Sequence, residues 1–382
     1  MMADAPQPLY LDYNATTPLD PRVFHAMMPW LQRPANAGSR THQYGQQAKE
    51  AVERAREQTA AVIGATPDEI VFTSGATESN NLVILGLAEW GKEIGRRHVL
   101  GTAIEHKAVL EPLERLRTLG FDVELLPVTQ GGFVEPDEVK RRRRQDTLLV
   151  SIMHANNETG VLQPVEEVGR LLEGTATLFH IDAAQTYGKE VDLLQRIPCD
   201  FLSISGHKIY GPQGIGALKI SKSKLDRRRL KALLVGGGQE RGFRSGTLPV
   251  AAVVGLGKAA ELARTEYRER REQARRVKKQ FLDGLSEVEY RLNGDQDRSQ
   301  LHVLNISFPG VDSEALMVEL REVVAISNGS ACTSSQYGPS HVLKAMGLDE
   351  ELIDSAVRIS WGIGVDAIPV DAFVGAAKTL RV

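Results

Sequence analysis

Short apolar runs alternate with amphipathic segments along roughly the first 220 residues of the chain. Apolar runs bounded by turn residues predict buried strands, and segments with apolar residues three or four positions apart predict helices. The predicted strands cover residues 70–73, 98–102, 123–128, 148–153, 178–181, 201–204 and 215–220. The predicted helices cover residues 45–63, 82–90, 107–119, 135–144 and 164–172.

This alternation decides the predicted fold class. Strands that alternate with helices are typical of a mostly parallel sheet covered on both faces, so we expect an α/β protein. A long charged helix is predicted at 261–285, and apolar strands at 303–308 and 323–327 indicate a smaller α+β unit after it. The predicted division is a large sheet domain over 15–258 and a small domain formed by 1–14 and 259–382.

Composition and charge limit the partners and the cell compartment that we expect for this protein. The chain has 382 residues and a net charge of −3, so no global field favours direct contact with nucleic acid or a membrane. The basic run 140–144 closes a predicted helix, where a solvated helix end is the simpler interpretation. Two cysteines cannot form a disulfide framework, and neither a signal peptide nor a membrane span is evident. A cytoplasmic protein is therefore expected.

Lys208 is the first candidate for chemistry, because it stands between an apolar strand and a glycine-rich turn. A lysine placed there can act as a Schiff-base amine, and a solvated loop lysine is the alternative. Other polar side chains also follow predicted strand ends, where ligands bind on parallel sheets. One pocket is expected to gather His106, Asn157, Asp182, Gln185, Ser205 and Lys208.

The loop 74–80 lies between a predicted strand and a helix. Backbone N–H groups and hydroxyls at such a helix start bind phosphate, but an ordinary helix cap by Thr77 or Ser79 explains the same residues. A lysine, an upstream acid such as Asp182 and a phosphate-ready helix start together describe a site for pyridoxal 5′-phosphate.

Nine motifs in this order resemble the cysteine desulfurases of the NifS/IscS type, which are fold-type-I pyridoxal phosphate enzymes. The resemblance covers nearly the whole chain and implies a large mostly parallel sheet domain with a small α+β domain. The motifs are LDYNATTP at 11–18, TSGATESN at 73–80, EHK at 105–107, NNETG at 156–160, DAAQ at 182–185, SGHKIYGP at 205–212, QERG at 239–242, RSGT at 244–247 and GSACT at 329–333.

The resemblance implies a role for each cofactor-site residue. Lys208 carries the cofactor and moves protons, Asp182 pairs with the pyridinium nitrogen, and Gln185 bonds the ring oxygen. His106 stacks on the ring as acid or base. The implied ligands of the cofactor phosphate are Thr77, Ser205 and His207 from the same chain and Thr247 from the other subunit of a homodimer.

Substrate contacts are implied in the same way. Arg358 is expected to clamp the carboxylate of L-cysteine, with help from Asn157 and Asn36. Cys332, in a loop of small polar residues, is the implied nucleophile that receives the sulfur as a persulfide. Cys199 is expected to pack as a small buried residue.

The chain departs from the family pattern at the loop 36–40 and in having only a short tail after Trp361. Both features look similar to desulfurases of DNA phosphorothioation systems, so phosphorothioate modification is the favoured pathway. A protein acceptor in iron–sulfur assembly or tRNA thiolation is the alternative. A selenocysteine lyase, a cysteine sulfinate desulfinase and a non-catalytic sulfur carrier or interaction protein are the other functions that remain open, while a plain aminotransferase has no need of Cys332.

Overall fold

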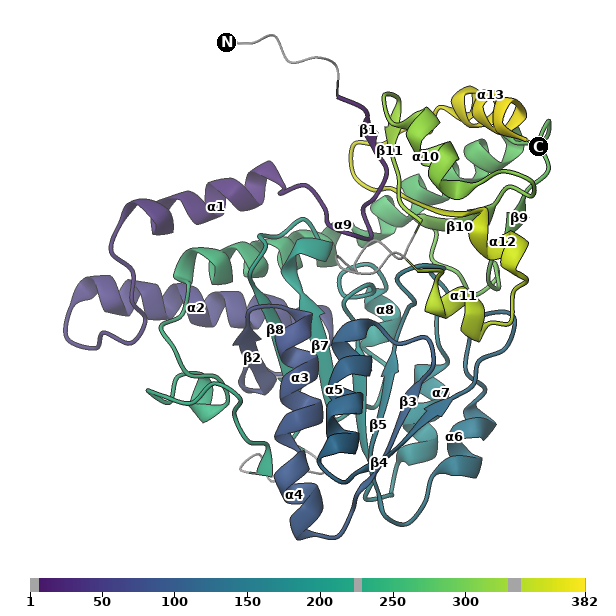
Figure 1. Ribbon diagram of the computed structural model, residues 1–382. Coiled ribbons are helices and arrows are strands. Elements are labelled where there is room, and N and C mark those ends of the chain that lie inside the picture. Colours follow the sequence, from purple (N-terminus) through teal and green to yellow (C-terminus); the bar gives the residue numbers. More distant parts are fainter. Residues whose placement is uncertain (1–6, 223–228, 329–337, 382) are drawn as a thin grey trace.

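The computed structural model describes residues 7–222, 229–328 and 338–381. A seven-stranded sheet forms the centre of its larger unit (Figure 1). The strands are β2 Ile70–Thr73, β3 His98–Thr102, β4 Asp122–Leu126, β5 Thr147–Met153, β6 Leu178–Asp182, β7 Phe201–Ser205 and β8 Gly216–Ile220, in the spatial order β2-β8-β7-β6-β5-β3-β4.

The sheet is mostly parallel. Only β8 runs against its two neighbours, β7 and β2, and the other pairs are parallel. β5, β6 and β7 are buried at every position, as parallel strands covered on both faces must be. The predicted α/β class is confirmed, and the predicted strand bounds differ from the observed ones by at most two residues.

Helices cover both faces of this sheet (Figure 1). On one face the side chains of Val83 and Val109 pack with Val99 of β3. On the other face Val52 and Val168 pack with Ile181 of β6. The helices of this part are α1 Pro21–Gln32, α2 Gln43–Val62, α3 Ala76–Gly86, α4 Ala88–Glu93, α5 Lys107–Thr118, α6 Pro136–Arg142, α7 Val165–Leu172 and α8 Val191–Leu194.

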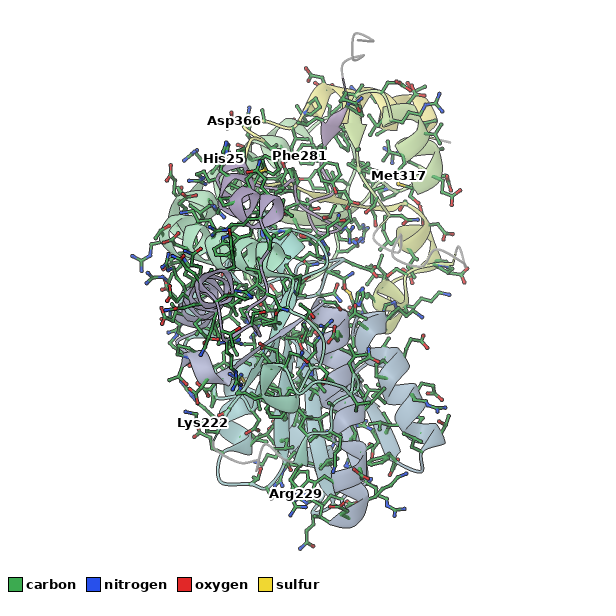
Figure 2. The ribbon with its side chains drawn as sticks, turned by 90° about the vertical axis from the view of Figure 1, so that its left-hand side faces the viewer. His25, Lys222, Arg229, Phe281, Met317 and Asp366 are labelled. Atoms are coloured by element: carbon green, nitrogen blue, oxygen red, sulfur yellow. The ribbon has the colours of Figure 1, made fainter. Side chains whose placement is uncertain are left out.

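The smaller unit has its own apolar core, which includes Leu11, Phe281 and Trp361. Figure 2 shows Phe281 and Met317 in this upper unit and Lys222 and Arg229 at the opposite end of the molecule. The division of domains at residues 15 and 258 stays a prediction.

The elements of the smaller unit begin with the long helix α9 Val250–Gly284 and the strand pair β1 Leu9–Tyr10 and β11 Val324–Ala325. Its antiparallel strands are β9 Arg291–Leu292, β10 Val303–Ser307 and β12 Ala356–Ser360, and its other helices are α10 Ser313–Leu320, α11 His341–Ala345, α12 Glu350–Asp354 and α13 Val370–Leu380.

Helix α9 begins well before the predicted start at residue 261. The apolar stretch 250–260 lacks the charged pattern of the later turns because it packs against α2 and the sheet core. A Cβ atom on Gly257 would lie 2.6 Å from Cα of Ala55, so these helices meet at a distance that only glycine permits. α9 thus contributes side chains to both apolar cores.

The helix predicted at 82–90 begins earlier, at Ala76, and gives way to α4 after Gly86. The small polar residues before Leu82 resemble a loop in sequence, yet the Glu78 carboxylate accepts a hydrogen bond from the Ser74 N–H at 2.8 Å. Acidic residues in a first helical turn stabilise the helix start in this way. None of the described helices is long and apolar enough to cross a membrane.

Candidate active site

A cavity of about 550 Å³ opens at the carboxyl ends of the parallel strands. Neighbouring strand ends contribute its polar residues, as the strand order predicts. The predicted site residues that line it are Thr77, His106, Asn157, Asp182, Gln185, Ser205, His207 and Lys208.

Lys208 ends a short 3-10 turn that follows β7 directly. Its Nζ donates hydrogen bonds to the backbone oxygens of Asn14, at 2.5 Å, and Ala15, at 2.8 Å. Thr17 fixes this arrangement, since its hydroxyl donates to the His207 carbonyl oxygen and accepts from the Tyr210 N–H. The N-terminal segment therefore holds the amine at the edge of the cavity.

Asp182 is the last residue of β6, and both of its carboxylate oxygens accept hydrogen bonds. Asn80 Nδ2 donates to Oδ2 at 2.7 Å, and the Ala184 N–H donates to Oδ1 at 2.9 Å. Asn80 lies on α3, so this contact joins the helix to the strand end and fixes the orientation of the acid. Sequence reasoning included Asn80 in a motif but assigned it no role.

Gln185 follows Asp182 and is buried. Its Nε2 donates to the Asn14 carbonyl oxygen at 3.0 Å. Its Oε1 is also buried and has no hydrogen-bond partner among the described residues. A buried acceptor without a donor is costly, so this oxygen indicates where a ligand donor fits.

His106 caps the N-terminus of α5, where its Nδ1 accepts from the Ala108 N–H at 3.1 Å. In the neutral ring the proton therefore sits on Nε2. Burial lowers the pKa of His106, nearby Lys208 lowers it further, and Asp182 acts in the opposite direction. The ring is thus neutral at physiological pH, with one proton available to a ligand.

The start of α3 forms the phosphate-ready end of the cavity, with Ser74, Gly75 and Thr77 in its lining. β8 approaches this loop so closely that a Cβ on Gly216 would lie 2.6 Å from Cα of Gly75. The pKa of His207 is lowered to about 4, mainly by burial and also by the nearby cations Lys208 and Lys189. His207 is therefore a neutral hydrogen-bonding residue in this site.

Arg358 does not line the cavity but lies buried behind it. Its Nη2 pairs with Asp12 Oδ1 at 2.6 Å, and its Nη1 donates to the Asn157 carbonyl oxygen at 3.1 Å. Its Nε is buried without a partner among the described residues. The predicted carboxylate clamp is therefore already held by Asp12, a residue that the sequence interpretation gave no role.

Asn36 and Thr247 lie together elsewhere, in a separate cavity of about 850 Å³. A buried bidentate pair, with both Arg56–Glu240 contacts at 2.8 Å, anchors the loop that leads to Thr247. A single chain therefore does not bring Asn36 or Thr247 to Lys208. For Thr247 this agrees with a role in a second subunit, and for Asn36 the predicted substrate contact stays a prediction.

Glu105, next to His106, is a further acid that sequence reasoning left without a role. Its Oε1 accepts from the Thr102 hydroxyl at 2.6 Å and from the Met153 N–H at 2.9 Å. Burial raises the pKa of Glu105 to about 8, so the group is protonated at neutral pH. A neutral side chain thus ties the end of β3 to the end of β5. The only sequence signal was its place in the EHK motif.

The two cysteines have different outcomes. Cys199 is buried in the core of the sheet unit, which confirms the prediction for it. Cys332, the predicted nucleophile, lies outside the described residues.

The residues of the cavity fit pyridoxal phosphate. They supply an amine on Lys208, an oriented acid on Asp182, a side-chain amide on Gln185 and a helix start at Thr77. These are the groups that bind the aldehyde carbon, ring nitrogen, ring oxygen and phosphate of this cofactor.

The chain is similar to known proteins over most of its length. Residues 9–373 match the family described as Aminotransferase class-V. The cysteine desulfurase IscS of Vibrio cholerae serotype O1 is 46% identical over 359 residues, which cover 93% of this chain and 88% of that protein. A NifS-like protein of solved structure has a TM-score of 0.88 at 36% identity and covers 98% of each chain.

A second solved structure, DndA from Streptomyces lividans, has a TM-score of 0.80 at 46% identity over 95% of this chain and 99% of its own. The family match, over residues 9–373, includes every residue that lines the Lys208 cavity. The chain belongs to the Aminotransferase class-V family and is a pyridoxal phosphate-dependent cysteine desulfurase.

Proposed function

We propose that this desulfurase converts L-cysteine to L-alanine and carries the sulfur as a persulfide on Cys332 before a protein acceptor takes it. The observation that carries the proposal is the cavity that brings Lys208, Asp182, His106 and Gln185 together. Bound pyridoxal phosphate supplies the electron sink for this chemistry.

The sulfur transfer balances without another oxidant. The Cys332 thiolate forms an S–S bond with the substrate sulfur while the Cβ–S bond of cysteine breaks. The electron pair of the broken bond stays on the carbon skeleton, and one proton added at Cβ completes alanine. The enzyme is left with a persulfide, which a thiolate of the acceptor can remove.

Lys208 and His106 are the proposed proton carriers. The Lys208 amine donates to the backbone oxygens of Asn14 and Ala15, and it leaves them when substrate binds. His106 offers its Nε2 proton to the reacting groups. We assign substrate carboxylate binding to Arg358 with Asn157, and this requires the Asp12 contact to be shared or exchanged.

A homodimer is part of the proposal, with Thr247 of one chain reaching the cofactor phosphate held by Thr77, Ser205 and His207 of the other. Asn36 is placed beside the substrate in that assembly. Supporting features are the separation of the two cavities within one chain and the exposed apolar run Leu233 to Val235, which is 86% exposed at Val235. Sedimentation of the holoenzyme tests it, and a monomer that keeps full activity would contradict it.

For the pathway we favour DNA phosphorothioate modification, carried out in the cytoplasm. The loop 36–40, which is similar to desulfurases of DNA phosphorothioation systems, supports this choice, while DndA from Streptomyces lividans and IscS of Vibrio cholerae are both 46% identical to the chain. The test measures transfer of labelled persulfide sulfur to purified acceptors. Transfer to a phosphorothioation protein is expected, and preferred transfer to an iron–sulfur scaffold or a tRNA thiolation enzyme would overturn the pathway.

The central test measures alanine and sulfide released from L-cysteine under reductant by wild type, Cys332→Ser and Cys199→Ser. Wild type and Cys199→Ser are expected to release equal amounts of both products. Cys332→Ser is expected to keep the cofactor absorbance and lose turnover. A Cys332→Ser enzyme that stays active on L-cysteine would favour a selenocysteine lyase or desulfinase instead, and a wild type without turnover would favour a sulfur carrier.

A further inference from the structure

A second, smaller cavity of about 60 Å³ lies on the far side of the Lys208 turn. Residues from the sheet unit, from α9 and from the smaller unit all contribute to its wall. The sheet unit supplies Lys189, Glu190 and Tyr210, α9 supplies Arg270 and Arg271, and the smaller unit supplies His302 and Trp361. No function assigned above uses this space.

Positive groups outnumber acids in the wall of this cavity. Lys189 Nζ lies 3.1 Å from His302 Nε2, and no described carboxylate lies within ion-pair distance of Lys189. The one acid in the lining, Glu190, already pairs with Arg271. Arg270 pairs with Glu266 outside the cavity, and its Nε is buried without a hydrogen-bond partner among the described residues. The wall therefore holds donors that lack an acceptor.

The surroundings of Lys189 explain how a lysine amine can be buried here without a carboxylate partner. The pKa of Lys189 is lowered to about 7, mainly by burial and also by nearby Lys208, while Glu190 acts in the opposite direction. His302 is neutral, because burial holds its pKa well below 6.5 and the nearby cations Lys189, Lys278 and Arg271 act in the same direction. An anion beside Lys189 would favour the protonated amine and satisfy it.

Much of the remaining wall is apolar, with the rings of Tyr13, Tyr210 and Trp361 and the side chain of Leu301. The cavity holds roughly four or five water molecules, which is also enough space for one small organic anion. The Arg271 side chain, 42% exposed, forms an accessible rim. Because one end of the cavity is charged and the other is apolar, it favours a ligand with a charged group and an apolar tail.

We propose that this cavity is a binding site for a short-chain carboxylate, with the carboxylate on Lys189 and Arg270 and the alkyl tail against Tyr210 and Trp361. The site is separate from the substrate cavity, because Lys208 directs its amine toward Asn14 and Ala15 instead. Its wall includes Thr17 and Tyr210, which hold the Lys208 turn. Binding of a carboxylate in this cavity is therefore expected to change the position of the Lys208 turn in the active site.

Calorimetric titration of the holoenzyme with butyrate tests the proposal. We expect one site per chain, with affinity about tenfold or more higher at pH 6.5 than at pH 8.5, because Lys189 loses its proton in that interval. Lys189→Met is expected to abolish binding. Lys279→Met, which removes an exposed lysine of α9 that does not line the cavity, is expected to leave binding unchanged. Absence of binding to wild type, or equal binding by Lys189→Met, overturns the proposal.

Crystals of the wild-type holoenzyme soaked in bromide give a measurement that does not depend on the folding of a variant. An anomalous peak between Lys189 and Arg270 is expected, since bromide probes the same positive wall. A cavity that holds only water, with bromide bound elsewhere, would contradict the proposed site.

Discussion

Single residues near the cavity hold the catalytic groups in place, and Asn80 is the clearest example. Its amide is the only side-chain donor to Asp182 among the described residues, at 2.7 Å. A hydrogen bond to a charged group contributes roughly 1.5–3 kcal/mol, and its loss leaves a buried carboxylate oxygen unpaired. Asp182 is expected to lose its fixed orientation when this donor is removed.

The first prediction is that Asn80→Ala lowers kcat/KM for L-cysteine by about tenfold or more, in line with that free energy. Steady-state kinetics with a visible spectrum of the bound cofactor measure the effect. The matched control is Asn81→Ala, whose amide donates only to the Thr77 carbonyl oxygen on the outer side of α3. Equal effects of the two substitutions would show that Asn80 does not act through Asp182.

The second prediction concerns the protonated state of Glu105. Its pKa of about 8 is higher than the ordinary value of 4.5, so the folded state binds more protons than the unfolded state between these pH values. Its contribution to stability is therefore complete below pH 4.5 and is lost as the pH rises toward 8, at up to about 1.4 kcal/mol per pH unit.

Glu105→Gln keeps a neutral side chain of the same shape at every pH. The variant is expected to gain stability relative to wild type as the pH rises from 5 to 8. Urea unfolding of both proteins at several pH values measures the difference in free energy of unfolding. A difference that does not change with pH would mean that Glu105 is ionised in the folded enzyme.

At the scale of elements, the contact between α2 and α9 joins the N-terminal part of the chain to the helix that spans both cores. The contact depends on glycine, because a Cβ on Gly257 would lie 2.6 Å from Ala55 Cα, a backbone atom that cannot move aside without shifting the helix. The opposite case is Gly375 in α13, where no atom lies within 4 Å of an added Cβ.

The third prediction follows from this pair of glycines. Gly257→Ala is expected to destabilise the enzyme by about 1–3 kcal/mol through overpacking. Gly375→Ala is expected to stabilise it by about 0.5–1 kcal/mol, since alanine is the better helix former. Urea denaturation of both variants measures the signs, and a stabilising Gly257→Ala would refute the close contact.

At the scale of the whole molecule, two predicted site residues, Asn36 and Thr247, lie away from the Lys208 cavity of their own chain. Asn36 and Thr247 line a cavity that shares no lining residue with the Lys208 cavity. In the proposed homodimer a site shared between two copies would account for this separation, because symmetric dimers place the same surface of each chain against the other.

The fourth prediction is subunit complementation. Lys208→Ala homodimers are expected to be inactive, and Thr247→Ala homodimers are expected to have reduced activity. Mixed dimers contain one intact site, with Lys208 from one chain and Thr247 from the other. Equal mixing and exchange of subunits should therefore restore up to about one quarter of wild-type activity. Activity that stays at the average of the two parents would place Thr247 in its own chain's site.

Local pattern was enough to predict the sheet strands and the residues at their ends. β3 and β5 contain the residues expected of them, because a buried strand is a run of apolar side chains that any chain segment displays by itself. Parallel strands then place Asp182, Ser205 and Lys208 at one edge without further information. The α9 start was missed because its first turns are apolar through packing on α2, which no local pattern reveals.

What the sequence by itself determined is thus the α/β sheet, the residues that gather in the Lys208 cavity and the family. Only the tertiary structure decided that Asp12 holds Arg358 across 346 residues and that Lys189 meets His302. It also decided the protonation of Glu105. The physical reason is the same in each case, since ion pairing and desolvation depend on which distant segments pack together, and side-chain type alone does not specify that packing.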